Sequence, residues 1–222
     1  IRYIFFVCMK FLDIPGLEQV VSELNTLENT ESTLIGTAEV FSLKLAGDDK
    51  QLYHDLNKSY ENFAMSPTNL SVSPFGPLTD SSSRKILISF VSTLNHVYSG
   101  HDFSEVRGHD FSKEPSFGVA FNHINSTIST SFPEYFTTGL KNRLWDLIQA
   151  YIAFEECEIY KFSPHSDLDP LANALWSIHY FFFNKNLKRV LYFSCGAKLK
   201  SAEYDMDDTD EFDDCQYFDM EV

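Results

Sequence analysis

The stretch from Ala174 to Cys195 places the strongest constraint on the fold of this 222-residue chain. Two runs rich in aromatic and β-branched residues, 174–183 and 187–195, flank the polar segment Asn184-Lys185-Asn186. Such runs, separated by a short turn that contains Asn, are typical of a β-hairpin. The hairpin therefore predicts a sheet with a large apolar surface, against which helices must pack.

Helical and strand patterns follow each other in mixed order along the rest of the chain. Apolar residues at helical spacing predict four helices: 15–28, about 50–63, one that opens at Pro115 and one after Pro133. Further strands are predicted over 33–45, whose buried face shifts midway at a bulge, over 86–97 and over 154–162. The predicted class is α/β: a two-layer sandwich with about five mostly antiparallel strands packed against about four helices.

Acidic residues outnumber basic ones by 32 to 17, which gives a net charge of −15. Ten of the acidic residues lie in 201–222, and removing that segment leaves 17 basic against 22 acidic residues. This balance disfavours direct, sequence-specific binding to nucleic acid and favours a basic protein surface as partner. The segment 201–222 is expected to be a disordered acidic tail, either a solvated end or a docking element.

One globular domain is expected over 9–200, preceded by an extra segment, 1–8, with Met9 as the natural start. The apolar run in 1–8 is too short to span a bilayer, and no membrane association is expected. A flexible loop rich in Ser and Pro is expected at 64–83. Candidate phosphorylation sites in it are Ser66, Ser73 and Ser83, although a plain linker explains the pattern about as well.

Cysteine and histidine spacing gives no sign of a cofactor. The four cysteines form no Cys-x-x-Cys pair, which argues against a disulfide framework or a structural zinc and fits a reducing compartment. The unit His-Asp-Phe-Ser occurs at 101–104 and again at 109–112. A metal-dependent phosphohydrolase that uses His101, Asp102, His109 and Asp110 is the enzyme alternative. A loop anchored by two buried phenylalanines explains the repeat better, because no further ligands can be assembled.

Several segments, in order, resemble the Maf-one family of RNA polymerase III repressors. The matching segments are Met9–Leu12, Ile35-Gly36, Lys44–Lys50, Ser83–Lys85, Thr93–Asn95, Asp102–Ser104, Phe111–Ser116, Glu156–Tyr160, Asp167–Pro170, Trp176-Ser177 and Tyr180–Val190. The last of these, in the hairpin, is the most specific. Two residues depart from the family pattern: His179 stands where Asn is expected, and Asn186 where Arg is expected.

The resemblance implies an α/β repressor without enzymatic activity that binds RNA polymerase III near its clamp and cleft. It would block engagement with the initiation factor that contains the TATA-binding protein and with promoter DNA. Kinases and phosphatases would control it, a monomer is expected, and it would shuttle between nucleus and cytoplasm. The candidate contacts with the polymerase are Lys44, Asp48, Asp49, Asp102, Phe103, Ser104, Lys185, Lys188 and Arg189.

Overall fold

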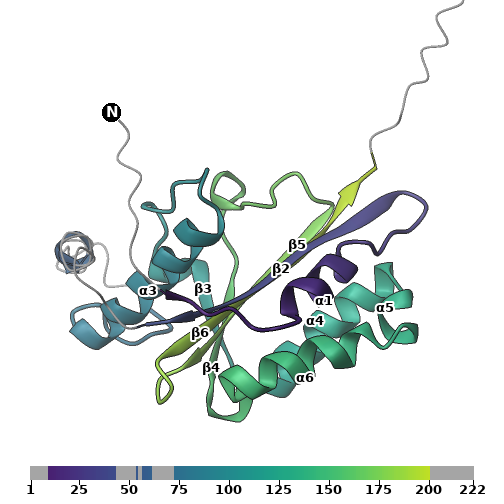
Figure 1. Cartoon of the computed structure of the whole chain (residues 1–222). Coiled ribbons are helices and arrows are strands. Elements are labelled where there is room, and N and C mark those ends of the chain that lie inside the picture. The colour runs from purple at the N-terminus through teal and green to yellow at the C-terminus, as the bar shows by residue number, and fades with distance from the viewer. Residues whose placement is uncertain (1–9, 44–53, 55–56, 62–72, 201–222) are drawn as a thin grey trace, which may run out of the picture.

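The computed structural model describes residues 10–43, 54, 57–61 and 73–200. Within these ranges, six strands form one sheet in the order β1-β2-β6-β5-β4-β3 (Figure 1). Every neighbouring pair of strands is antiparallel. The strands are β1 (Lys10–Phe11), β2 (Ser32–Ser42), β3 (Phe111–Glu114), β4 (Glu158–Phe162), β5 (Trp176–Asn184) and β6 (Arg189–Leu199).

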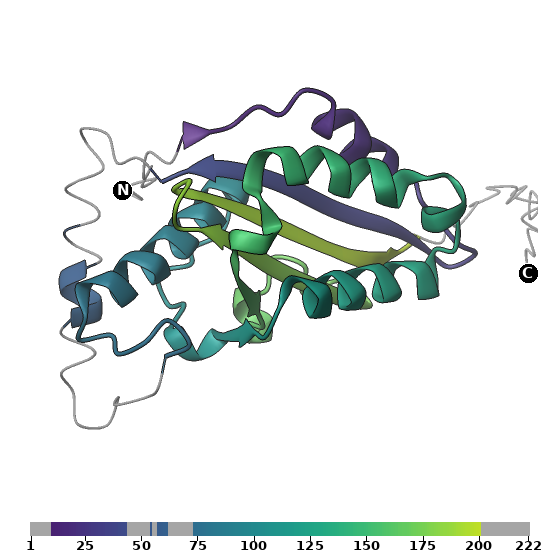
Figure 2. The same ribbon diagram turned by 90° about the horizontal axis from the view of Figure 1, so that it is seen from below.

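Helices cover both faces of this sheet (Figures 1 and 2). One face carries α1 (Leu17–Leu24), α4 (Phe117–Ser131), α5 (Glu134–Thr137) and α6 (Leu140–Ile152). The other face carries α3 (Ser81–Val97) and the helical residues 57–61. The predicted α/β class is confirmed, with six strands rather than about five and with helices on the second face as well. Within the described ranges, every helix is too short or too polar to cross a membrane.

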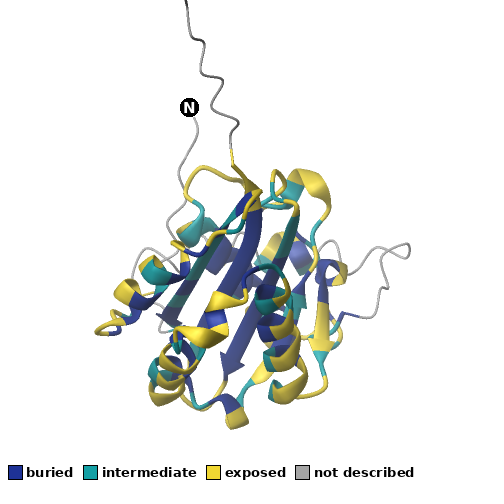
Figure 3. Cartoon of the chain, turned by 90° about the vertical axis from the view of Figure 1, so that its right-hand side faces the viewer, coloured by how far each residue is buried: buried dark blue, intermediate teal, exposed yellow. Residues whose placement is uncertain are grey.

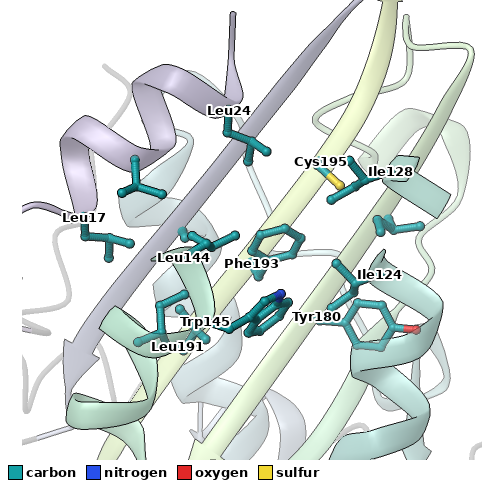
Figure 4. Packing of buried hydrophobic residues seen from close by; sticks show 14 of the residues in the cluster. Leu17, Leu24, Ile124, Ile128, Leu144, Trp145, Tyr180, Leu191, Phe193 and Cys195 are labelled. Atoms are coloured by element: carbon teal, nitrogen blue, oxygen red, sulfur yellow. The ribbon is translucent and has the colours of Figure 1, made fainter. Parts of the chain in front are cut away.

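The first core lies between the sheet and α1, α4, α5 and α6, and its side chains come from all of these elements (Figure 4). Trp145 of α6 packs against Phe193 of β6, with 5.7 Å between the ring centroids. One amide satisfies the polar atoms buried here: Asn125 Oδ1 accepts hydrogen bonds from Trp145 Nε1 at 3.0 Å and from the Tyr135 hydroxyl at 2.8 Å. The core therefore buries indole and phenol groups without losing their hydrogen bonds.

The second core is mostly aromatic and lies between the sheet and α3. Phe90 of α3 stacks on Phe181 of β5, with 4.3 Å between the ring centroids. Tyr180 and Phe182 of the same strand belong to the first core, so successive β5 side chains alternate between the two cores. The aromatic run in β5 is continuous because the strand is buried on both faces (Figure 3), as is usual for a central strand of a covered sheet.

Two predictions around α3 are wrong. Residues 86–97 are helical, not a strand, because Leu87, Phe90, Val91 and Leu94 recur at helical spacing on the buried side of α3. The loop predicted at 64–83 extends too far, since α3 begins at Ser81. Arg84 stabilises this start: its guanidinium donates hydrogen bonds to the carbonyl oxygens of residues 78 and 79, at 2.8 and 2.6 Å. Residues 64–72, 1–9 and 201–222 lie outside the described residues.

The shift of the buried face along β2 has a simpler cause than the predicted bulge. Pairing between β2 and β6 runs without interruption from Ser32 to Ser42. Leu34, Ala38 and Val40 enter the first core, whereas Phe41 enters the second core. The pattern changes because α3 covers the second face at this end of the strand, where the His96 ring lies 5.0 Å from that of Phe41.

Candidate functional site

A buried hydrogen-bonded network joins the middle of β5 and β6 to the loop before β5. His179 of β5 lies between the Tyr192 hydroxyl, 2.8 Å from Nδ1, and Asp169 Oδ1, 3.1 Å from Nε2. Asp169 also accepts hydrogen bonds from the Ser177 hydroxyl at 2.8 Å and the Leu171 N–H at 2.7 Å. Because an ionised carboxylate only accepts, His179 Nε2–H is the donor to Asp169, while the Tyr192 hydroxyl holds the ring from its Nδ1 side.

The network continues to the end of α3. The Tyr98 hydroxyl lies 2.8 Å from Ser194 Oγ and 3.4 Å from the Tyr192 hydroxyl. The Tyr98 ring also contacts the rings of His101 and Phe103, at centroid distances of 5.9 and 6.2 Å. The network therefore fixes the start of the loop that contains Asp102 and Ser104, two of the predicted contact residues.

The electrostatics of the network favour a charged Asp169 and neutral tyrosines. Burial alone would raise the pKa of Asp169, but hydrogen bonds from His179, the Leu171 N–H and Ser177, with the charge of His179, lower it below its usual value of 3.8. Burial raises the pKa of Tyr192 well above 10.0. Tyr192 is completely buried and His179 is only 1% exposed, so these two side chains are shielded from solvent, and with Asp169 they act as a structural brace.

The loop after α3 is anchored by one side chain and exposes its neighbours. Phe103 is only 1% exposed and belongs to the second core, so it positions the loop and does not itself offer contact area. Asp102 is exposed, and its Oδ1 accepts the Ser104 N–H at 2.9 Å. Asp102 and Ser104 are therefore the residues of this group that a partner can reach.

The turn between β5 and β6 exposes two basic side chains. Lys185 and Lys188 are exposed, and Lys188 has a left-handed backbone conformation with φ 51°. Arg189 is half-buried and donates from Nη1 to the Tyr151 carbonyl at 2.6 Å, while Asn184 Nδ2 donates to the Ile152 carbonyl at 2.8 Å. These two bonds fasten the turn to the C-terminal end of α6, so Arg189 positions the turn that presents the two lysines.

The predicted contact residues do not form one cluster. The loop is tied to Ser194, five residues along β6 from Arg189, which places it about 17 Å from the turn along the strand. Lys44, Asp48 and Asp49 lie outside the described residues. Leu43, the residue before them, donates its N–H to the Lys188 carbonyl at 2.8 Å. The structure thus offers two separate candidate surfaces, the 101–104 loop and the 185–188 turn.

The repeated His-Asp-Phe-Ser unit gives no support to the phosphohydrolase alternative. Phe103 and Phe111 are both buried, as the loop interpretation predicts. Asp110 is buried and accepts the Arg107 N–H at 2.7 Å, while His109 Nε2 lies 3.7 Å from the Asp110 carboxylate. Among the described residues, no three His, Cys, Asp or Glu side chains lie close enough together to hold a metal ion.

The two described cysteines and two of the candidate phosphorylation sites are partly or fully buried. Cys157 and Cys195 are free thiols, and burial raises the pKa of Cys157 to about 12 and that of Cys195 further. Ser73 and Ser83 are each only 4% exposed, and the Ser83 hydroxyl donates to the Phe75 carbonyl at 3.0 Å. Ser66 lies outside the described residues. A kinase therefore reaches Ser73 or Ser83 only after local opening of the chain.

Sequence reasoning singled out His179 as a departure but missed its place at the centre of the network. Its partners come from three separate segments: the 167–170 loop, β6 and, through Tyr192, the end of α3. The available signal was a histidine inside an otherwise apolar strand, together with a carboxylate ten residues upstream. Buried polar side chains need partners, and that requirement could have pointed to Asp169.

The Maf1 regulator family matches residues 34–194 of this chain, a range that includes the network and both candidate surfaces. A curated relative, the repressor of RNA polymerase III transcription maf1 of Schizosaccharomyces pombe, is 35% identical over 198 residues, covering 84% of this chain and 82% of the relative. The repressor of RNA polymerase III transcription of Dictyostelium discoideum is 29% identical, covering 92% of this chain and 94% of the relative. A crystal structure of citrus MAF1 superposes with a TM-score of 0.66 and 29% identity, over 83% of this chain and 99% of that one.

We predict that Asp169→Asn destabilises the protein, because the amide brings an N–H₂ group where a carboxylate accepts three hydrogen bonds. The expected loss is about 1–3 kcal/mol at neutral pH, measured by urea unfolding. The folded-state pKa of Asp169 is lowered, so its contribution is present above pH 3.8 and is lost as pH falls through the lowered value. The difference in the free energy of unfolding between wild type and variant must therefore shrink in acid.

The matched control is Asp167→Asn, because Asp167 is exposed two residues away on the same loop. This variant should unfold like the wild type at every pH. Equal stability of the Asp169 and Asp167 variants at neutral pH would contradict the bracing role of the network.

Proposed function

This chain belongs to the Maf1 regulator family, and on that premise we propose that it represses transcription by RNA polymerase III by binding the polymerase. The observation that carries the proposal is the extent of the family match, residues 34–194, which spans both candidate surfaces and the network that braces one of them. The curated relatives described above are named as repressors of RNA polymerase III transcription.

The proposed mode of action is occlusion near the clamp and cleft of the polymerase. An acidic chain with net charge −15 is attracted to a basic groove that otherwise holds nucleic acid. Within the folded domain, the lysines of the 185–188 turn would contact an acidic patch of the polymerase. Asp102 and Ser104, in the loop that is tied to the middle of β6, would contact a second patch of the polymerase. A bound repressor of this kind would exclude promoter DNA and the initiation factor that contains the TATA-binding protein.

We also propose control by phosphorylation, with kinases and phosphatases as partners and with movement between nucleus and cytoplasm. A phosphate adds about −1.5 to −2 charges at neutral pH. Ser83 lies in the first turn of α3 and is buried, so a phosphate there could not keep the present packing. Modification would open this end of α3 and alter the surface that follows it. The protein is proposed to act as a monomer.

The proposal is tested by mixing the purified, dephosphorylated protein with purified RNA polymerase III. Co-elution on size exclusion and loss of factor-directed transcription of a transfer RNA gene are expected. The free promoter fragment alone should not bind. Absence of both co-elution and inhibition, with protein shown to be folded, would overturn the proposal.

Charge reversal at the turn, Lys185→Glu with Lys188→Glu, is predicted to weaken binding to the polymerase about tenfold, or about 1.4 kcal/mol. Both side chains are exposed, so stability should stay within about 0.5 kcal/mol of the wild type. The dissociation constant can be measured from binding of the protein to polymerase immobilised on a surface. Lys198→Glu, an equally exposed lysine near the other end of β6, is the control and should bind normally.

A negative charge at Ser83 is predicted to destabilise the domain, whereas the same charge one residue earlier is tolerated. Ser83→Glu buries an unpaired carboxylate and should cost at least about 2 kcal/mol in urea unfolding. Ser82 is exposed in the same helical turn, where an acidic side chain interacts favourably with the helix N-terminus, so Ser82→Glu should change stability by less than about 1 kcal/mol. Similar effects of the two substitutions would show that burial of Ser83 is not what limits its modification.

A further inference from the structure

The helical residues 57–61 contact two parts of the chain that are far apart in the sequence. Figure 2 shows this short segment beside α3. Asn57 and Glu61 contact Arg84, the fourth residue of α3. Tyr60, which is buried in the second core, instead reaches the loop that follows α3. The segment therefore touches both the start of α3 and the loop after its end.

Tyr60 holds the second half of the loop after α3. Its hydroxyl donates to the Val106 carbonyl at 3.1 Å, and the guanidinium carbon of Arg107 lies 5.8 Å from the centroid of its ring. Burial raises the pKa of Tyr60 to about 12, so at neutral pH the hydroxyl keeps the proton that it donates. Arg107 in turn donates from Nη1 to the Ser104 carbonyl at 2.7 Å. Both contacts of Tyr60 thus act on the main chain close to Ser104.

Asp102 and Ser104 are exposed, so their place is set by how the main chain of the loop is held. Phe103 and Val106 are buried in the second core, but apolar packing has little directional preference. A hydrogen bond is directional, so the bond from Tyr60 to the Val106 carbonyl also fixes the orientation of that peptide group. Tyr60 therefore complements the network of His179, which holds the start of the same loop.

Arg84 ties the segment 57–61 to the start of α3. Its buried guanidinium donates from Nε to Asn57 Oδ1 at 2.8 Å, and Nη2 lies 3.8 Å from a carboxylate oxygen of Glu61. The same side chain holds two carbonyl oxygens just before α3. A buried charge that loses its partners is costly, so the segment and the start of α3 stabilise each other. Opening of either one weakens the other.

We propose that Tyr60 is a positioning residue for the surface formed by Asp102 and Ser104. Its helical segment, 57–61, couples that surface to the start of α3. Opening of this start, which a charge at the buried Ser83 requires, frees the segment from α3 and withdraws the Tyr60 hydroxyl from the loop. The part that this surface plays in repression rests on the proposed function, whereas the coupling is a property of the fold and is measured without the polymerase.

The positioning role is tested by native-state hydrogen exchange on the full-length protein, with Tyr60→Phe compared to Tyr135→Phe. Each variant keeps its buried ring and loses one hydroxyl bond, the first to the Val106 carbonyl and the second to Asn125 Oδ1 in the first core. Relative to the amides of β5 and β6, Tyr60→Phe should speed exchange of the hydrogen-bonded Val106 and Arg107 amides about tenfold. Tyr135→Phe should leave that ratio unchanged. Equal ratios in the two variants would overturn the positioning role.

The coupling to α3 is tested with Asn57→Ala, which removes the acceptor of Arg84 Nε and leaves the loop itself unchanged. Exchange of the same two loop amides should speed up about fivefold in the wild-type background. In the Tyr60→Phe background the effect should fall below about twofold, because the Tyr60 hydroxyl carries the coupling. Lys58→Ala, at an exposed position of the same segment, is the control and should have no effect. Equal acceleration by Asn57→Ala in both backgrounds, or none in either, would overturn the coupling.

Discussion

Burial of the β5–β6 hairpin on both of its faces is the constraint on which the rest of the structure depends. Tyr180 and Phe182 enter one core while Phe181 and Phe183 enter the other, so neither set of helices can be removed without exposing large aromatic surfaces. Both edges of the hairpin are paired as well, with β2 on one side and β4 on the other. Its turn is consequently a rigid projection, and Lys185 and Lys188 are presented at a defined place.

A sheet covered on both sides can bury polar side chains at low cost only where they form hydrogen bonds. In this chain, networks of hydrogen bonds satisfy the polar side chains that the sheet buries. Asn125 serves the first core by accepting from Trp145 and Tyr135. His179 serves the second by joining Asp169 to Tyr192. The second network also reaches the loop after α3. The hydrogen bonds that satisfy these buried polar groups therefore also hold Asp102 and Ser104 in position.

The sequence predicted elements whose pattern is local. The hairpin, α4 and the strand at β2 are confirmed because turn chemistry and periodicity are contained in a short stretch. The prediction from sequence was wrong at α3, because a run of Ile, Leu, Phe and Val fits a strand as well as a helix until the surface that it packs against is known. Tyr98, by contrast, joins the network of His179 from a distant part of the chain, so no local pattern could reveal its place there.

One hairpin joins the two cores, and we infer that it thereby holds both candidate surfaces in a single cooperative unit. Native-state hydrogen exchange, measured amide by amide, tests it most directly. We expect the protected amides of α3, of α6 and of β5 and β6 to exchange with one free energy, equal to that of global unfolding by urea. A markedly lower free energy for α3, with its own dependence on urea, would contradict the claim and show that the second core opens independently.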